Sequence, residues 1–156
     1  MRDFEAVYGD KKMVKKIKLS IPTRIPESYI KKELKELYQW VVNNLRKDGR
    51  LDVELKRKNY ISINYRLNRT LAWVIQLIYL INGLPFQDAR WIHKELLKMR
   101  LKPNNCLERL NKIVNLGSGE KDVRKKITIF RKFVYELDDI IQRNYTGILS
   151  VRKELR

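Results

Sequence analysis

One histidine and one nearby arginine are the residues of this chain whose types and spacing come closest to a catalytic pair. His93 is the only histidine, and Arg90 precedes it with two residues between them. A histidine can accept the proton of a ribose 2′-hydroxyl while an arginine stabilises charge on the neighbouring phosphate, a chemistry that cleaves RNA. A single histidine excludes any mechanism that needs two. We expect His93 to be an exposed or hydrogen-bonded side chain rather than a catalyst.

Two other patterns resemble phosphate or metal sites, and neither meets the chemical requirement. Residues 117–119 read Gly-Ser-Gly before a predicted helix, but Lys121 followed by Asp122 does not supply the lysine and hydroxyl of a P-loop. Asp138 and Asp139 are adjacent, so on a helix they point about 100° apart and cannot chelate one metal side by side. The sequence predicts no catalytic residue, no metal site and no cofactor.

The positive charge is the strongest signal in the composition. The chain has 35 Lys and Arg against 18 Asp and Glu, a formal net charge of +17, which predicts attraction to polyanions or phosphates. A lysine-rich background composition explains the same charge equally well. The candidates for binding phosphate or a substrate are Arg66, Arg69, Arg90, His93 and Lys94. The candidates for binding nucleic acid are Lys121, Arg124, Lys125 and Arg131.

Aromatic residues interleave with these basic residues. Aromatic and arginine side chains together bind bases and phosphates. Aromatic residues at helical spacing are nevertheless more often part of a hydrophobic core, and the core is the interpretation that we favour. The residues concerned are Tyr60, Tyr65, Trp73, Tyr79 and Trp91.

A nearly all-apolar stretch, residues 71–81, must position these side chains. Ten of its eleven residues are hydrophobic and only Gln76 interrupts them. At about 1.5 Å rise per residue a helix of this length spans roughly 16 Å, too short to cross a membrane. We expect a buried helix at the centre of the fold, ended by Gly83 and Pro85.

The remaining chain predicts a mostly α fold, a helical bundle of about five helices with a short N-terminal β-hairpin. Apolar residues at intervals of three and four predict the helices, and Asn104 or Asn105 and Ser118 are the expected N-caps of the last two. Residues 51–59 are expected to be irregular. The helices are expected over residues 27–46, 60–81 and 88–102, then from the cap at 104 or 105 to Gly117, and from the cap at 118 to about residue 145.

The N-terminal segment contains two β-like pieces, residues 4–8 and 13–21, in which apolar residues alternate with lysines. An isolated hairpin is marginal in water. It must pack on the helices, pair with another chain, or form the trailing strands of a larger sheet. The expected organisation is a hairpin over 1–22, a bundle over 23–145 and a basic tail over 146–156 that frays.

The cysteine content points to a reducing compartment. Cys106 is the only cysteine, which excludes an intramolecular disulfide and a cysteine zinc cluster, and we expect it to pack within a helix. The N-terminus is polar and has no apolar segment typical of a signal peptide. We expect a cytoplasmic protein that does not cross a membrane.

A local pattern around the apolar stretch resembles a known family. Residues 69–73, Arg-Thr-Leu-Ala-Trp, precede residues 77–85, Leu-Ile-Tyr-Leu-Ile-Asn-Gly-Leu-Pro, and residues 89–92, Ala-Arg-Trp-Ile. This order resembles the C-terminal helical domain, a HEPN-like substrate-binding bundle, of polymerase-β-like nucleotidyltransferases. Members often show Leu-x-Asn-x-x-Tyr-x-Pro and then Lys-Trp. Here the proline comes earlier than in that pattern, and arginine replaces the lysine.

The resemblance covers about residues 26–144 and implies a domain that lies over a nucleotidyltransferase active site and holds the second substrate. The catalytic motif of that family, Gly-Ser followed by Asp-x-Asp, is absent. The resemblance therefore implies a non-catalytic substrate-binding or partner domain for a phosphate-bearing or nucleotide-type ligand. Its partner would be a separate nucleotidyltransferase catalytic chain or domain, or RNA, DNA or a nucleotide, and dimerisation is a further option.

Two other functions stay open from the sequence. The first is a stand-alone basic nucleic-acid-binding helical module, whose affinity would fall steeply with salt. The second is a HEPN-type ribonuclease that uses Arg90 and His93, although such enzymes place more residues between the two than this chain does.

Overall fold

The structure is a computed structural model that describes residues 25–86, 89–145, 147–148, 150 and 155. The predicted hairpin over residues 1–22 and the predicted helix start at Asp88 lie outside these residues. Within them the chain is helical and contains no strand. The mostly α, bundle-like class predicted from the sequence is thereby confirmed for the described part of the chain.

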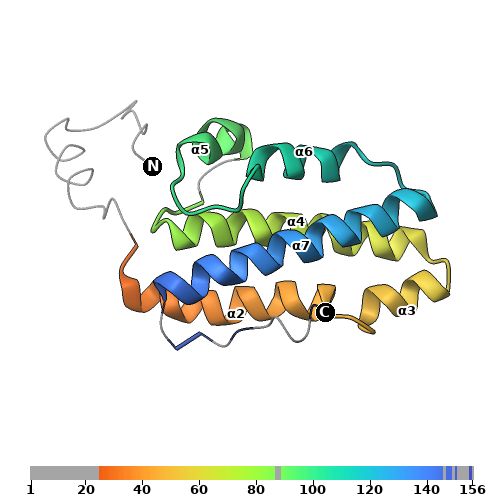
Figure 1. Cartoon of the computed structure of the whole chain (residues 1–156), viewed down its shortest axis with the longest axis horizontal. Helices are drawn as coiled ribbons and strands as arrows, with labels where there is room; N and C mark the ends of the chain where they lie inside the picture. Colours follow the sequence, from red (N-terminus) through yellow and green to blue (C-terminus); the bar gives the residue numbers. More distant parts are fainter. Residues whose placement is uncertain (1–24, 87–88, 146, 149, 151–154, 156) are drawn as a thin grey trace, which may run out of the picture.

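Three long helices, α2, α4 and α7, form the body of the bundle (Figure 1). The shorter α5 and α6 lie along one side of it, and α3 lies at the end where α4 begins. Helices α2 and α4 run antiparallel. The bounds are α2 Glu27–Leu45, α3 Arg50–Lys56, α4 Tyr60–Ile81, the 3-10 helix η1 Ala89–Trp91, α5 Ile92–Lys98, α6 Cys106–Asn115 and α7 Glu120–Asn144.

Helix α3 corrects the prediction that residues 51–59 are irregular. Leu51 and Leu55 are buried, whereas Val53 between them is 38% exposed. Spacing of four residues places the two leucines on one helical face. The alternation of apolar and charged residues concealed this spacing because Val53, which points to solvent, looked like a member of the same apolar set.

The helix ends agree with the sequence at Gly83 and differ at Ser118. Gly83 has φ +68°, a conformation that glycine adopts without steric cost, and its amide donates to the Leu80 carbonyl at 2.9 Å. Helix α7 begins one residue later than predicted, with Gly119 as its N-cap. The predicted cap of α6 occupies the right position, but the Asn105 side chain makes no capping bond and its backbone is left-handed.

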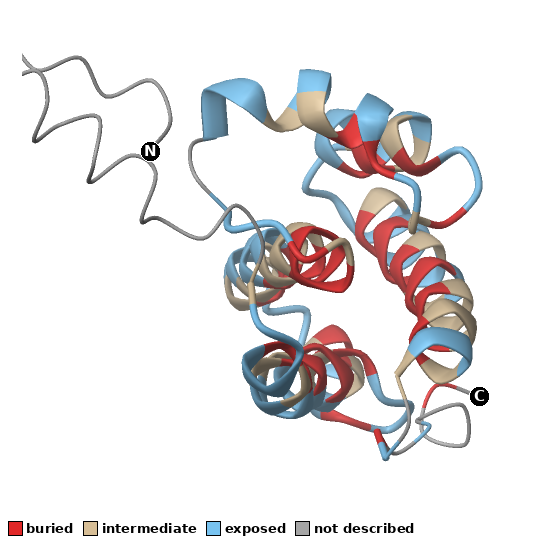
Figure 2. Cartoon of the chain, turned by 90° about the vertical axis from the view of Figure 1, so that its left-hand side faces the viewer, coloured by how far each residue is buried: buried red, intermediate tan, exposed pale blue. Residues whose placement is uncertain are grey.

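The apolar stretch within α4 is less enclosed than predicted. Val74 and residues 77–81 are buried, but Ala72 is exposed and Trp73 is half-buried. Buried residues of the bundle face one another while the outer faces of the helices are exposed (Figure 2). Helices α2 and α7 both pack on α4 and leave the third side of its middle turns open. The expectation of burial on nearly every side is therefore wrong for this part of the stretch.

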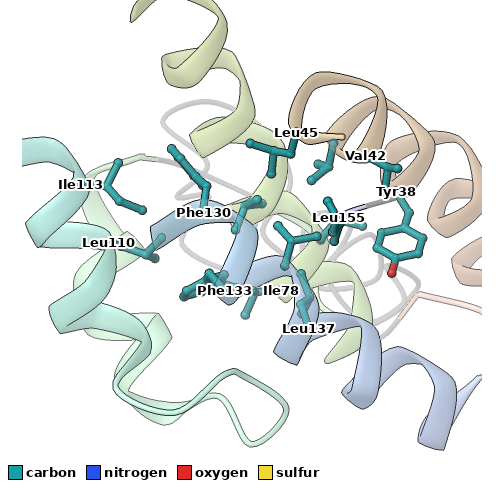
Figure 3. Packing of buried hydrophobic residues seen from close by; sticks show 14 of the residues in the cluster. Tyr38, Val42, Leu45, Ile78, Leu110, Ile113, Phe130, Phe133, Leu137 and Leu155 are labelled. Carbon is teal, nitrogen blue, oxygen red and sulfur yellow. The ribbon is translucent and has the colours of Figure 1, made fainter. Parts of the chain in front are cut away.

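The core joins all the long helices and includes two residues of the C-terminal segment. Phe130, Phe133 and Leu137 of α7 are fully buried together with Ile78 of α4 (Figure 3). Leu155 lies among the α2 and α7 side chains in the same view. Close packing of this kind is what gives a bundle of this size its stability.

Two described residues of the C-terminal segment pack on the bundle, whereas most of the expected basic tail over residues 146–156 lies outside the described residues. Ile148 and Leu155 are 6% and 7% exposed. The Ser150 hydroxyl donates to Asp138 Oδ2 at 2.8 Å, and the Tyr145 hydroxyl donates to the Ile81 carbonyl at 2.9 Å. These contacts fasten the segment to α7 and to the end of α4.

Cys106 is buried at the start of α6, as predicted. Burial raises the pKa of its thiol to about 11. The thiolate is the reactive form, so this cysteine is chemically inert in the folded protein. In the described part of the chain, no helix has the length and apolar character needed to cross a membrane.

Candidate functional site

Four side chains gather on the outer surface where α2 and α4 pack together. Trp40 of α2 lies beside Trp73 of α4, with ring centroids 5.6 Å apart and planes inclined by 52°. The guanidinium of Arg69 lies 4.8 Å from the centre of the Trp73 ring and 5.8 Å from that of Tyr65. We call these four residues the aromatic surface. It joins a cation to three rings, two of which, Trp40 and Tyr65, are 57% and 62% exposed.

Arg69 carries the charge of this surface. Its side chain is exposed, and none of the ion pairs within the described residues involves it. Stacking on Tyr65 and Trp73, one helical turn away on either side, holds the guanidinium in place. A stacked guanidinium keeps its N–H edge for hydrogen bonds, so it is arranged to accept an anionic oxygen.

Local sequence explains how α2 and α4 position the surface. Trp40 is not one of the buried residues of α2. When those residues pack in the core, the indole of Trp40 stays on the outside of the helix, next to Trp73 of α4. Beneath it, Asn44 Nδ2 donates to Thr70 Oγ1 at 3.3 Å, and Thr70 Oγ1 donates to the Arg66 carbonyl at 2.9 Å. Thr70 is fully buried. This polar link fixes the relative position of the two helices under the aromatic surface.

The predicted phosphate-binding residues fall into two separate groups. The first group is Arg66 and Arg69 on α4. Arg66 is half-buried, and its Nε atom is buried without a hydrogen-bond partner. Arg90 lies in η1, beyond the C-terminal end of α4, whereas Arg69 precedes that end by about 18 Å of helix. His93 and Lys94 are exposed on α5. Arg66 and Arg69 thus lie together on α4, whereas Arg90, His93 and Lys94 lie beyond its C-terminal end.

The second group, Arg90, His93 and Lys94, lies on η1 and α5 beside Trp91. Lys94 Nζ lies 5.6 Å from the centre of the Trp91 ring, and Trp91 is 49% exposed. The carboxylate of Glu95, which follows Lys94 in the sequence, accepts a short hydrogen bond from the Tyr79 hydroxyl. Burial, followed by the bond to Glu95, raises the pKa of Tyr79. This tyrosine belongs to the core and not to a ligand site.

The predicted nucleic-acid-binding residues on α7 have different surroundings. Lys121 and Lys125 are exposed. Arg124 is paired with Glu120 at 2.7 Å, and this bond, together with one from the Tyr60 hydroxyl, holds the pKa of the Glu120 carboxyl below its usual value. The Tyr60 bond also joins the first turns of α4 and α7. Of the four predicted residues, Arg124 and Arg131 form ion pairs, and Lys121 and Lys125 are the exposed lysines.

Arg131 has a structural role in the described fold. Its Nε donates to the Leu45 carbonyl at 2.7 Å. Its Nη2 donates to Asp52 Oδ2 at 2.8 Å and to the Arg46 carbonyl at 3.3 Å. These carbonyls end α2, where the helix has no donors of its own left. Arg131 thus caps α2 from α7 and holds α3 beside it.

The aromatic surface includes one residue, Trp40, that is not among the site residues predicted from the sequence. Trp40 breaks the three-and-four spacing of the apolar residues of α2. A large aromatic residue off the apolar stripe is a signal for exposure, and it could have identified the site. Trp73 and Tyr65 were assigned to the core, but only Trp73 packs partly against it.

Comparisons of the chain with protein-family models, with curated proteins and with solved structures find no match. Within the described residues, no group of three or more His, Cys, Asp or Glu side chains is arranged to hold a metal ion. The chemistry of the aromatic surface is therefore the basis for a functional assignment: one exposed, unpaired guanidinium and several open ring faces.

Proposed function

We propose that this chain is a non-catalytic helical binding domain of the kind that accompanies nucleotidyltransferases, and that it recognises a phosphate-bearing, nucleotide-type ligand. The observation that carries the proposal is the exposed guanidinium of Arg69 stacked on Trp73 without a carboxylate partner. A phosphate oxygen satisfies the N–H edge of such an arginine, and a nucleobase satisfies a neighbouring ring face.

The accessory role is supported by the family resemblance of residues 69–92 and by the positive charge of the chain. In this proposal nucleotidyl transfer itself belongs to a separate catalytic chain or domain. The bundle contributes affinity for the ligand and orients its phosphates through Arg69.

Replacing Arg69 with glutamine is expected to weaken the binding of ATP at low salt by about ten-fold or more, because hydrogen bonds to charged groups contribute roughly 1.5–3 kcal/mol. Isothermal titration calorimetry with ATP and with adenosine measures the effect. Adenosine should bind more weakly than ATP to the natural protein. Arg100→Gln removes an exposed arginine from the connection between α5 and α6 and should leave the affinity unchanged. Equal ATP affinity of the natural protein and Arg69→Gln contradicts the proposal.

A second candidate function, a stand-alone nucleic-acid-binding module, is favoured by a row of exposed lysines on α7. Lys121, Lys125 and Lys132 are exposed and share one face at intervals of four and seven residues. At about 1.5 Å per residue they span roughly 16 Å along the helix. Such a row can contact successive phosphates without reading the bases.

Changing these three lysines to glutamine is expected to reduce the salt dependence of binding to a 20-base-pair duplex. Each phosphate contact contributes about 0.9 to the slope of log affinity against log salt, so the slope should fall by about 3. Fluorescence anisotropy at several salt concentrations measures it. A control protein with Lys32, Lys35 and Lys98 changed to glutamine has the same net charge and should keep the slope. Absence of duplex binding even at low salt excludes this candidate.

A further inference from the structure

We infer that the aromatic surface of Trp40, Tyr65, Arg69 and Trp73 is a base-stacking site for a single-stranded nucleic-acid segment about four to five nucleotides long. This inference rests on the proposed function and names the ligand class of the same site. It follows from the open ring faces, their separation along α4 and the distribution of charge around them.

The open ring faces are the first argument. Trp40 and Tyr65 expose more than half of their surface, and the 52° tilt between Trp40 and Trp73 prevents them from covering each other by parallel stacking. Single exposed aromatic residues are ordinary on protein surfaces. Three rings beside one unpaired arginine are a different arrangement, and it matches the stacking platforms and cations that hold single strands.

The separation of the rings determines the length of the ligand. Tyr65 and Trp73 are eight residues apart on α4, about 12 Å along the helix axis. One strand of nucleic acid advances about 3.4 Å per nucleotide when its bases are stacked. A segment of about four to five nucleotides, which has three to four such steps, therefore reaches both ends of the surface, with a phosphate at Arg69 between them. A mononucleotide reaches only one ring.

Charge around the surface is asymmetric and gives the strand a path. Lys47 lies in the turn that follows α2, two residues beyond its last residue, while Glu36 precedes Trp40 by one helical turn. Beyond the lysine, a shallow depression open to solvent is lined by Asn43, Arg46, Asp48, Gly49 and Arg50. The α2–α3 turn, residues 46–50, has three basic residues against one aspartate, whereas lysines and glutamates are equal in number in the first half of α2. A polyanion is therefore attracted toward the turn.

The surroundings favour a single strand over a duplex or an apolar protein partner. The exposed neighbours of Trp40 on α2 include Gln39 and Asn43, whose amides bond to each other at 3.2 Å. Amide groups offer hydrogen bonds to base edges and form no continuous apolar patch. In a duplex the base faces are already stacked and are not accessible to the rings.

The test measures binding of oligouridylates of one to eight nucleotides by quenching of tryptophan fluorescence at low salt. Affinity is expected to rise with length up to about four to five nucleotides and to level off for this single site. Trp40→Ala and Tyr65→Ala should each weaken binding of the tetranucleotide by roughly five-fold to a hundred-fold. Both residues are exposed, so circular dichroism should show an unchanged fold. Trp91→Ala removes another exposed tryptophan, in η1, and should have no effect.

Each outcome supports or overturns the inference. ATP binding without any gain for the tetranucleotide overturns the single-strand assignment and leaves the proposed function intact, whereas absence of binding to both rejects the two together. Equal losses in Trp40→Ala and Trp91→Ala, or equal affinity for a duplex, also overturn it. A dimer in sedimentation that dissociates in Trp40→Ala would assign the surface to a protein contact instead.

Discussion

Replacing Asp138 with alanine is expected to destabilise the fold by about 3 kcal/mol, because it removes the common acceptor of a buried hydrogen-bond network. The Asp138 carboxylate is fully buried. It accepts a short bond from Tyr38 of α2, a 2.8 Å bond from Ser150 and a 3.4 Å bond from Gln142. Alanine leaves the two hydroxyl donors without this acceptor. For a chain of this size the midpoint of thermal unfolding should fall by roughly 6–12 °C.

Differential scanning calorimetry and urea unfolding measure this change, and two variants sharpen it. Asp138→Asn keeps one acceptor oxygen and should lose about half as much stability as Asp138→Ala. Glu36→Ala removes an exposed helical carboxylate and should change the midpoint by less than about 2 °C. A midpoint in Asp138→Ala equal to that of the natural protein would show that the network contributes nothing to stability.

The second large effect is expected at Asn82, whose side chain connects the end of α4 to the segment between α5 and α6. Its Nδ2 donates to the carbonyls of Ile78 at 2.7 Å and Leu101 at 2.8 Å, and its Oδ1 accepts from the Leu101 amide at 3.0 Å. Asn82→Ala should cost about 2–3 kcal/mol. Asn82→Asp should cost at least as much, because a carboxylate would face two carbonyl oxygens in place of the amide donor.

Hydrogen exchange at the Leu101 amide gives the local readout for Asn82. In Asn82→Ala this amide loses its acceptor and should exchange at least ten times faster, while core amides of α7 change only with the global stability. Asn111→Ala, at an exposed asparagine of α6, is the matched control and should leave the Leu101 amide protected. Unchanged protection in Asn82→Ala would mean that other contacts hold the α5–α6 segment.

The helices were predictable from the sequence wherever burial on one face dominates the pattern. The stripes of α2 and α7 and the stop at Gly83 follow from local spacing and from the backbone freedom of glycine. Helix α3 was missed because a seven-residue helix with one exposed valine gives too few positions to separate a period of two from one of 3.6. The packed residues of the tail were missed because Ile148 and Leu155 form no periodic pattern of their own.

The candidate site was only partly predictable, because a charge count does not show which cations already have partners. Arg69 and Arg131 look equivalent in the sequence. In the fold one lies unpaired on aromatic rings, and the other is occupied by Asp52 and by the carbonyls that end α2. Such partners come from residues 79 and 86 positions away, beyond any local pattern.

The tethers between α2 and α7 also bear on the order in which the bundle assembles. The Tyr38–Asp138 and Arg131–Leu45 bonds join residues 100 and 86 positions apart. Closing a longer loop costs more conformational entropy, so we expect contacts of this kind to form after the nearer pairing of α2 with α4. Interactions that form late act mainly on the unfolding rate. The Asp138 network and the Arg131 cap therefore determine how long the native state persists more than how quickly it is reached.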